Sequence, residues 1–291
     1  MSVRNPYAVP GTFRKAQLHC HTTESDGRFR PRDLLVMYRD AGYAFVCITD
    51  HNHVTRCGDL NDEHFLAIPG TEDTVSTFLP VLGPHMGRLF VDAPLRAGSP
   101  QERVDRTLAD GGVVSLCHPS WNGNLWTGAW REHTLVSLRG FQLLEVWNPH
   151  SRSGEDTRLW DAMLRARGPA APLWGVAVDD CHRDKQFNRG WIAVKVPEIS
   201  VAALRRALLG GAFYASTGPA ADFSAVGESI TVQLEDRGHI RFADSRGIIR
   251  SEVDGTESRY AVYGNEQFVR VEVSSPAGMA WSQPFWLDSG L

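Results

Sequence analysis

Histidine and acidic residues recur in this sequence at spacings that suit a metal site. His19 and His21 flank Cys20, and the same alternation returns at Asp180-Cys181-His182. In a β-strand, residues two apart point to the same face, so each pair could present two ligands to one ion. Imidazole and carboxylate groups are common ligands of catalytic metals. Taken alone, one such pair would as readily be a feature of the core or the surface.

Further residues of the ligand type stand at the ends of other short apolar runs. Asp50-His51 closes one run, Glu72 follows a second and His118 follows a third. Catalytic groups of α/β barrels gather at the carboxyl ends of the strands, where parallel strands finish side by side. Five strand ends that each carry such a residue therefore predict one shared metal centre.

Strands and helices alternate through the first two-thirds of the chain. The predicted strands, rich in Val, Ile, Leu or Phe, cover 16–21, 45–50, 65–68, 88–91, 113–117, 141–146, 173–179 and 191–196. The predicted helices run from Pro31 to a stop at Gly42, and over 100–110, 154–167 and 200–209. This alternation predicts an α/β fold with buried parallel strands. Seven or eight such units suit a closed barrel better than an open sheet.

The pattern changes after about residue 215 of the 291. The runs at 230–234, 240–242, 260–262 and 268–274 tend to alternate apolar and polar residues, with Gly, Asp and Ser between them. This alternation is typical of antiparallel strands that have one solvated face. We expect a small all-β appendage that is joined to the first part through Thr217-Gly218-Pro219.

The composition of the chain limits the kinds of molecule that it could bind and the cell compartment in which we expect it. The 30 basic and 34 acidic residues give a formal charge of −4, which disfavours binding to duplex nucleic acid. No apolar run approaches the ~20 residues that a membrane helix needs, and the N-terminal residues lack the apolar segment of a secretion signal. Five cysteines without a CxxC spacing argue against a disulfide framework. We expect a cytoplasmic protein that acts on a small molecule, with its oligomeric state open.

Five motifs together resemble one known group of enzymes. LHCHTTESDG, ITDHN, PGTED, CHPSW and VDDCH are similar to motifs of the PHP (polymerase and histidinol phosphatase) superfamily over residues 16–217. GAFYASTGP and AWSQPFWL resemble, more particularly, the CehA/McbA-type metallohydrolase branch. The resemblance implies an α/β fold with a distorted (β/α)7 barrel that holds up to three ions at the carboxyl ends of its strands. The barrel would span 1–217, and the small antiparallel β-rich domain 218–291.

The resemblance also implies a set of ligands, which we carry over residue by residue. His19, His21, Glu72 and Asp180 would hold one ion; Glu72 would bridge to a second ion with His85 and His118; Asp26, His51 and His182 would hold a third. Glu72, Asp180 and His182 are predicted to be catalytic as well. A mixed shell of imidazoles and carboxylates suits two or three divalent ions of Zn, Mn or Fe better than Mg or Ca. As single residues, Asp26 could instead be a turn residue and Glu72 a cap.

The predicted reaction is a hydrolysis. Ions that share a carboxylate lower the pKa of a bound water, so that a bridging hydroxide can attack without a Ser or Cys nucleophile. The positive site favours an anionic substrate, which we take to be a small phosphomonoester or phosphodiester. Arg183, Lys185 and Arg189 would then bind the phosphate, unless they form only a solvated basic loop.

Two alternatives remain open at this stage. The branch resemblance includes hydrolases of carbamate or carboxylic esters, and Trp121, Trp126, Trp130 and Trp147 could line a pocket for an aryl leaving group. The other alternative is a PHP-like module that has lost its metals and only binds. Asp50 and Asp179 adjoin predicted ligands and would either orient imidazoles or cap loops. His53, His64, His133, His150 and His239 have no partner at ligand spacing, so we expect them to be structural or exposed.

Overall fold

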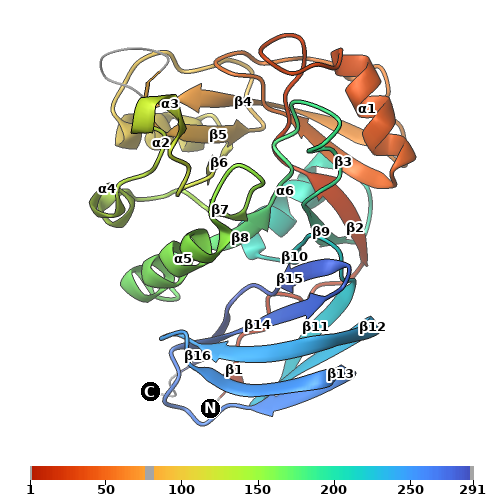
Figure 1. Ribbon diagram of the computed structural model, residues 1–291, viewed down its shortest axis with the longest axis vertical. Helices are drawn as coiled ribbons and strands as arrows, with labels where there is room; N and C mark the ends of the chain where they lie inside the picture. The colour runs from red at the N-terminus through yellow and green to blue at the C-terminus, as the bar shows by residue number, and fades with distance from the viewer. Residues whose placement is uncertain (1, 76–81, 289–291) are drawn as a thin grey trace.

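A computed structural model describes residues 2–75 and 82–288 (Figure 1). The strands are β1 (Ser2–Val3), β2 (Thr12–Gln17), β3 (Tyr43–Ile48), β4 (Leu66–Thr74), β5 (His85–Leu89), β6 (Val113–Leu116), β7 (Leu143–Trp147), β8 (Trp174–Ala177), β9 (Trp191–Val196), β10 (Phe213–Ser216), β11 (Ala221–Val226), β12 (Ser229–Asp244), β13 (Ile249–Ala261), β14 (Phe268–Ser275), β15 (Gly278–Trp281) and β16 (Phe285–Asp288). The helices are α1 (Pro31–Asp40), α2 (Pro100–Ala109), α3 (Gly123–Trp126), α4 (Glu132–Ser137), α5 (Ser153–Arg167) and α6 (Val201–Gly210).

The strands join in one mixed sheet, which confirms the predicted α/β class. The order β9-β2-β3-β4-β5-β6-β7-β8 contains four parallel pairs, β2 with β3, β3 with β4, β6 with β7, and β7 with β8. The described strands form an open path that ends at β8. The predicted closed (β/α)7 barrel is therefore not confirmed.

Strand β5 departs from the predicted parallel arrangement, because it runs antiparallel to both β4 and β6. Ten residues separate the end of β4 from the start of β5. A parallel crossover usually takes a dozen or more residues, so a separation of ten residues favours an antiparallel pair. Strand β9 likewise pairs antiparallel with β2.

The segments that follow β2 and β8 meet at the carboxyl end of the sheet. Cys20 and Cys181 form an isolated parallel bridge. The amide of His21 donates to the carbonyl of Cys181 at 3.0 Å, and the amide of Asp180 donates to the carbonyl of His19 at 3.1 Å. Both cysteine side chains are buried on the side away from the ligands. This bridge brings the two HxH-like pairs of the sequence face to face.

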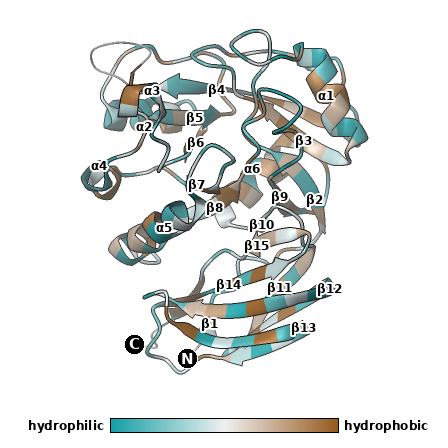
Figure 2. Cartoon of the chain, in the orientation of Figure 1, coloured by the Kyte–Doolittle hydropathy of each residue, from teal (hydrophilic) through white to brown (hydrophobic). Residues whose placement is uncertain are grey.

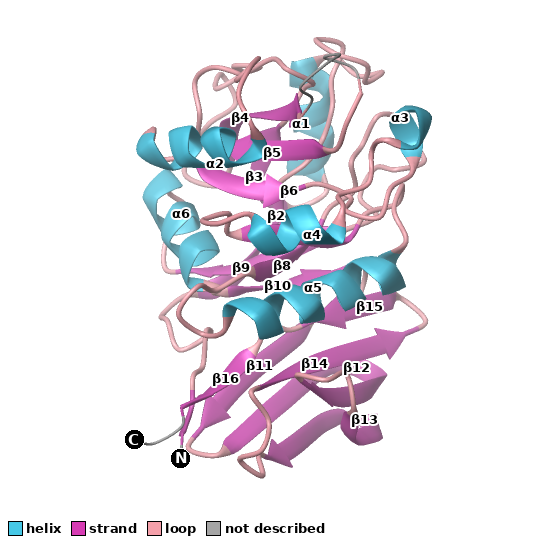
Figure 3. Ribbon diagram, turned by 90° about the vertical axis from the view of Figure 1, so that its left-hand side faces the viewer, coloured by secondary structure: helices cyan, strands magenta, loops and turns pink. Residues whose placement is uncertain are grey.

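The helices lie on the outside of the sheet (Figure 3), and α1 and α6 have the end signals that the sequence predicts. Helix α1 has Pro31 in its first turn and buries Leu34, Leu35 and Tyr38. The side chain of Ser200 accepts from the amide of Ala203 and caps α6, which ends at Gly211 in the left-handed conformation. The short helices α3 and α4 were not predicted. No helix among the described residues is long and apolar enough to cross a membrane.

The strands after residue 217 are antiparallel, with mixed hydrophilic and hydrophobic residues along their length (Figure 2). They remain continuous with the rest of the sheet, since β15 pairs with β10 and β16 pairs with β1. Arg270 on β14 also forms a buried ion pair with Asp161 on α5, at 2.7 Å between Nε and Oδ1. Hydrogen bonds and packing both cross residue 217. The predicted domain boundary there stays a prediction.

Candidate metal centre

The predicted ligands converge on one cavity at the carboxyl end of the parallel strands. The cavity has a volume of about 600 Å³. Its lining comprises Asp26, His51, Glu72, His85, His118, Trp121, Asn124, His150, Asp180, His182, Arg183, Lys185 and Gln186. His19 and His21 lie beneath this lining, fully buried against Glu72 and Asp180. The structure thus brings together all nine residues that the sequence assigns as ligands.

Glu72 stands at the centre of the cluster, where its two oxygens face different imidazoles. Oε1 lies 2.9 Å from Nδ1 of His85 and 2.9 Å from Nε2 of His118. Oε2 lies 3.1–3.2 Å from ring nitrogens of the other three imidazoles, those of His19, His21 and His51. Strand β4 fixes this position, because Glu72 pairs with Gly87 of β5 and bridges to His51 on its other side. One carboxylate can therefore serve two ions, as the sequence assignment requires.

The first predicted ligand set surrounds the ring nitrogens of His19 and His21. Nε2 of His19 and Nε2 of His21 are 3.1 Å apart. Each lies 3.1–3.2 Å from Oε2 of Glu72 and 3.2–3.3 Å from Oδ1 of Asp180. Four donors at ~2.0 Å from a common ion in a tetrahedral arrangement would be ~3.3 Å from one another. His19, His21 and Glu72 therefore have donor spacings that suit a divalent cation, and Asp180 lies at the same distance from both imidazoles.

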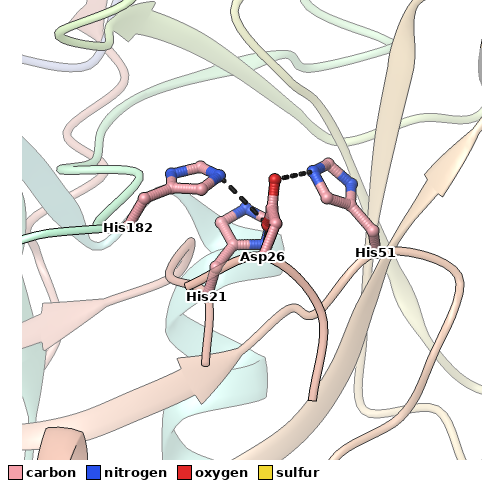
Figure 4. A group of neighbouring side chains, drawn as sticks. All are labelled: His21, Asp26, His51 and His182. Carbon is pink, nitrogen blue, oxygen red and sulfur yellow. Dashed lines mark ion pairs between the residues drawn. The ribbon is translucent and has the colours of Figure 1, made fainter. Parts of the chain in front are cut away.

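The third predicted set surrounds Asp26, beside His21 (Figure 4). Oδ1 of Asp26 lies 3.3 Å from Nε2 of His182, and Oδ2 lies 3.6 Å from Nε2 of His51. Nδ1 of His21 is 3.7 Å from Oδ1. The turn packs closely on the strand end, since a Cβ on Gly27 would lie 2.3 Å from the carbonyl oxygen of His21. Asp26 is thus more than a turn residue, because its carboxylate faces three imidazoles.

The remaining set joins His85 and His118 through Oε1 of Glu72. The other ring nitrogen of His85, Nε2, lies 3.0 Å from Nδ2 of Asn124. The indole of Trp130 donates to the carbonyl oxygen of His85 at 3.0 Å and so supports the start of β5. His85 begins β5, which agrees with its expected place at a strand and puts it inside the cluster.

Several atoms of these ligands lack ordinary partners. Among the described residues, Nδ1 of His51, Nδ1 of His118 and Oδ1 of Asp180 are buried without a hydrogen bond. His118 and Asp180 also have left-handed backbone, with φ of 30° and 46°. Such strain is uncommon outside glycine and clusters at functional sites. The orphaned Oδ1 of Asp180, which stands on a strained strand end beside the imidazoles of His19 and His21, fits a bound cation that would accept its lone pair.

Burial and neighbouring charges act in opposite directions on the pKa values of these groups. Burial alone would raise the pKa of Glu72, but the surrounding imidazoles, His19 foremost, hold it well below its usual range. Burial would lower the pKa of His21, yet its hydrogen bonds with Asp180 and Glu72 raise it to about 9. Burial dominates at His51 and lowers its pKa to about 4. The carboxylates are therefore ionised at neutral pH, and a cation entering the cluster would displace protons from some of the imidazoles.

The sequence reasoning missed Glu145 and His150, and it considered Asn148 only as a residue after a strand end that could wall the pocket. Glu145 and Asn148, from β7 and the loop after it, are buried against the ligands His19 and Asp180. An acidic residue inside the apolar run LLEVW was the available signal for Glu145. His150 lines the cavity, with its ring centroid 5.7 Å from that of His182. No other residue of the ligand type stands at ligand spacing from His150 in the sequence, so its place in the cavity follows only from the fold.

Asp50 and Asp179 hold loops rather than imidazoles. Asp50 accepts from the amide and hydroxyl of Thr22 at 2.7 Å and from the hydroxyl of Ser25 at 2.6 Å. Asp179 accepts from the hydroxyl of Tyr38 and from the amide of Asn188, both at 2.8 Å. Of the two roles considered for this pair, loop support is the one that these contacts show.

The predicted substrate residues separate in space. Arg183 and Lys185 line the cavity, whereas Arg189 is exposed and is not among its described lining residues. The four tryptophans also separate. Trp121 lines the cavity, with its ring centroid 4.7 Å from that of His118. Trp126 is 83% exposed, Trp130 is buried in the core, and Trp147 packs over Gly190.

Comparison with known proteins identifies the fold. No family model and no curated protein matches the chain. A two-domain protein from Bacteroides vulgatus, described as containing a predicted PHP-like metal-dependent phosphoesterase, aligns over 97% of this chain and 98% of its own, with 18% identity and a TM-score of 0.56. A putative metal-dependent phosphoesterase from Bifidobacterium adolescentis covers 67% of this chain and 96% of its own, with 15% identity and a TM-score of 0.44. An amidohydrolase from Chromobacterium violaceum, with bound sulfate and no metal, covers 57% of this chain and 87% of its own, with 15% identity and a TM-score of 0.41. The likeness to the Bacteroides protein agrees with the PHP resemblance at the level of the fold alone: this chain shares the fold of that protein over nearly its whole length.

Proposed function

We propose that this chain is a metal-dependent hydrolase whose substrates are small phosphomonoesters or phosphodiesters. The observation that carries the proposal is the carboxylate of Glu72, which lies within 3.2 Å of ring nitrogens from five imidazoles. A buried cluster of this density is the arrangement that several cations sharing one ligand require. The shared fold with a predicted PHP-like phosphoesterase agrees with it.

The ligand sets would be those predicted from the sequence. His19, His21, Glu72 and Asp180 would hold one ion, His85 and His118 would hold a second with Glu72, and Asp26, His51 and His182 would hold a third. Bound ions would lower the pKa of a water molecule and withdraw charge from the scissile bond. The preference for Zn, Mn or Fe rests on the mixture of imidazole and carboxylate donors.

The chain's own residues would orient the substrate and supply positive charge at the site where it binds. Glu72, Asp180 and His182 face the cavity, where each can contact a reacting group. Arg183 and Lys185 stand at the same opening and can bind phosphate oxygens, the arginine through two parallel hydrogen bonds. Four carboxylates, counting Glu145, reach the imidazole cluster, so two or three divalent ions would leave little excess charge. The two basic side chains then supply much of the attraction for an anion.

One observation favours a second substrate class. Trp121 forms an indole wall of the cavity directly against His118, and such a wall suits the aryl group of a carbamate or carboxylic ester. The other three tryptophans considered for this role are absent from the described lining. The aromatic surface is therefore smaller than the sequence predicted, and the two basic residues favour the phosphoester. The CehA/McbA assignment stays part of this proposal.

The test combines metal analysis with a substrate panel. We expect the purified protein to carry two or three transition-metal ions per chain, and to lose activity with a chelator and regain it with added metal. Fewer than about half an equivalent, after growth with added metal, would favour the metal-free binding module. Activity on phosphoesters but not on aryl carbamates or esters supports the proposal. Activity confined to the carbamates would overturn the phosphoesterase assignment and leave the metal centre standing.

A further inference from the structure

Glu145 is a buried carboxylate behind the metal centre, outside the predicted ligand set. It lies on β7, has no exposed surface and faces the back of the cluster rather than the cavity. Oε1 lies 2.7 Å from Nδ1 of His19. Oε2 accepts from the backbone amide of His118 at 2.6 Å and from Nδ2 of Asn148 at 2.8 Å. Its two oxygens thus contact three groups, two of which belong to predicted ligands.

The contact with His19 determines which ring nitrogen can bind a metal. A carboxylate accepts hydrogen bonds, so the hydrogen lies on Nδ1 of His19, toward Glu145. Nε2 then keeps a free lone pair on the side of His21, Glu72 and Asp180. A histidine that ligates through one nitrogen is commonly fixed in this way through the other, and the partner raises the basicity of the ligand. Glu145 thus selects the ligating tautomer.

Asn148 extends the same arrangement to Asp180. Its Oδ1 accepts from the amide of His150 at 2.9 Å, which fixes the orientation of the side-chain amide. Nδ2 therefore faces two carboxylates, and donates to Oε2 of Glu145 at 2.8 Å and to Oδ2 of Asp180 at 3.2 Å. Oδ1 of Asp180 is left without a hydrogen bond and points toward His19 and His21. One amide thus orients the acidic ligand and separates two negative charges.

We propose that Glu145 and Asn148 are positioning residues for the first ion, acting through His19 and Asp180. The inference rests on the proposed metal-dependent function and goes beyond the ligand set. It assigns to this buried pair, one strand away from the ligands, a role in setting the affinity of the site for a single ion. Among the hydrogen bonds of the described residues, the other two ligand sets contact this pair through the backbone amide of His118.

The variant Glu145→Gln isolates the effect, because it keeps the shape and removes one acceptor. If the amide nitrogen faces His19, Nδ1 must accept, and the hydrogen moves to Nε2, which then cannot bind a metal. If the amide nitrogen faces the other side, it opposes the N–H groups of His118 and Asn148. Either orientation disturbs the first site. Losses of ~10- to 100-fold in metal affinity are usual for such partners of a ligating histidine.

Asp156 provides a matched control. It is also fully buried, and its Oδ1 accepts from the backbone amide of Ser120 at 2.9 Å, in the loop that begins at His118. Asp156 makes no hydrogen bond with a predicted ligand among the described residues. Asp156→Asn therefore changes a buried carboxylate to an amide near the site without touching a ligand imidazole.

The experiment measures Zn²⁺ binding to the full chain by competition with a chromophoric chelator, with circular dichroism of each metal-free protein as the check of folding. We expect Glu145→Gln to weaken one Zn²⁺ equivalent by ~10- to 100-fold and to leave the remaining equivalents near wild type. Asn148→Ala, which removes both of its donated hydrogen bonds, should weaken the same equivalent, and Asp156→Asn should match wild type.

The outcomes separate this inference from the proposed function. If the wild-type chain binds no Zn²⁺, the proposed function fails. If it binds Zn²⁺ and a folded Glu145→Gln or Asn148→Ala protein binds every equivalent as tightly, the positioning role is wrong and the metal centre stands. If Glu145→Gln does not fold, Asn148→Ala decides. Equal losses in the Asp156→Asn control would also overturn the inference, because the effect would then be general to buried carboxylates.

Discussion

Replacing Glu72 by glutamine should be the most damaging single change at the metal centre. Glu72 is the one residue assigned to two ions, and its oxygens face imidazoles on both sides. Glu72→Gln preserves the volume and removes the charge. One end of the new side chain must present N–H groups to imidazoles that now face a carboxylate oxygen. We therefore expect two ions to weaken together.

The size of the loss follows from the distances. Opposite unit charges ~3 Å apart interact by on the order of 5 kcal/mol at an effective dielectric constant of about 20. The cavity is open to water, which screens part of this energy. If about half remains, the loss is on the order of 3 kcal/mol, or ~10²-fold in an equilibrium constant. Turnover should fall at least as far, since the same ions supply the nucleophile.

The assay compares metal content and hydrolysis rate for wild type, Glu72→Gln and His53→Ala. His53 is an exposed imidazole two residues after His51 and is not among the cavity's described lining residues, so its loss should change neither quantity. Both variants should fold, because neither side chain belongs to the apolar clusters. The reasoning is refuted if Glu72→Gln keeps near-normal metal content and rate while His53→Ala abolishes them.

Three further predictions test the cavity, the packing and a buried acid. Arg183→Ala should raise KM for an anionic substrate about tenfold with a smaller change in kcat, while Arg189→Ala, outside the cavity lining, should match wild type in steady-state kinetics. Arg270→Met leaves Asp161 buried and unpaired, so urea denaturation should show a loss of about 3–5 kcal/mol that a second change, Asp161→Asn, partly restores. Burial raises the pKa of Asp156 to about 6, above its unfolded value, so the stability contributed by its protonated form is lost as pH rises through about 6. In thermal melts from pH 4 to 8, Asp156→Asn should remove this part of the decline, and an unchanged pH profile would contradict the assignment.

The strand ends could be predicted because their ligands are encoded locally. Spacing of two at His19 and His21 fixes a shared face wherever the segment is extended, and the structure places both rings against Glu72. Pro31 and Gly211 likewise signal helix ends without reference to the rest of the fold. Local signals of this kind predicted four of the described helices and the ligands at the strand ends, whereas Asp26 and His85 entered only through the family resemblance.

The parts that could not be predicted depend on contacts distant in sequence. Strand β5 runs antiparallel to β4, while its apolar run fits either direction. Glu145 acts on His19 from 126 residues away, and nothing in its own neighbourhood signals that partner. The short helix α3 contains left-handed Asn124 and Leu125, which helix propensity does not favour, so no periodic pattern marked it.

The metal centre is assembled from segments whose backbone is held by other interactions, and this separates ligand binding from folding. Glu72 lies within paired β4, and the ends of β2 and β8 are joined by the bridge between Cys20 and Cys181. The left-handed backbone of His118 and Asp180 costs about 1–2 kcal/mol per residue. The apolar clusters beneath the sheet must offset these costs when no cation is bound. A bound cation would then enter a site that is already built, so loss of one ligand should reduce affinity well before it unfolds the chain.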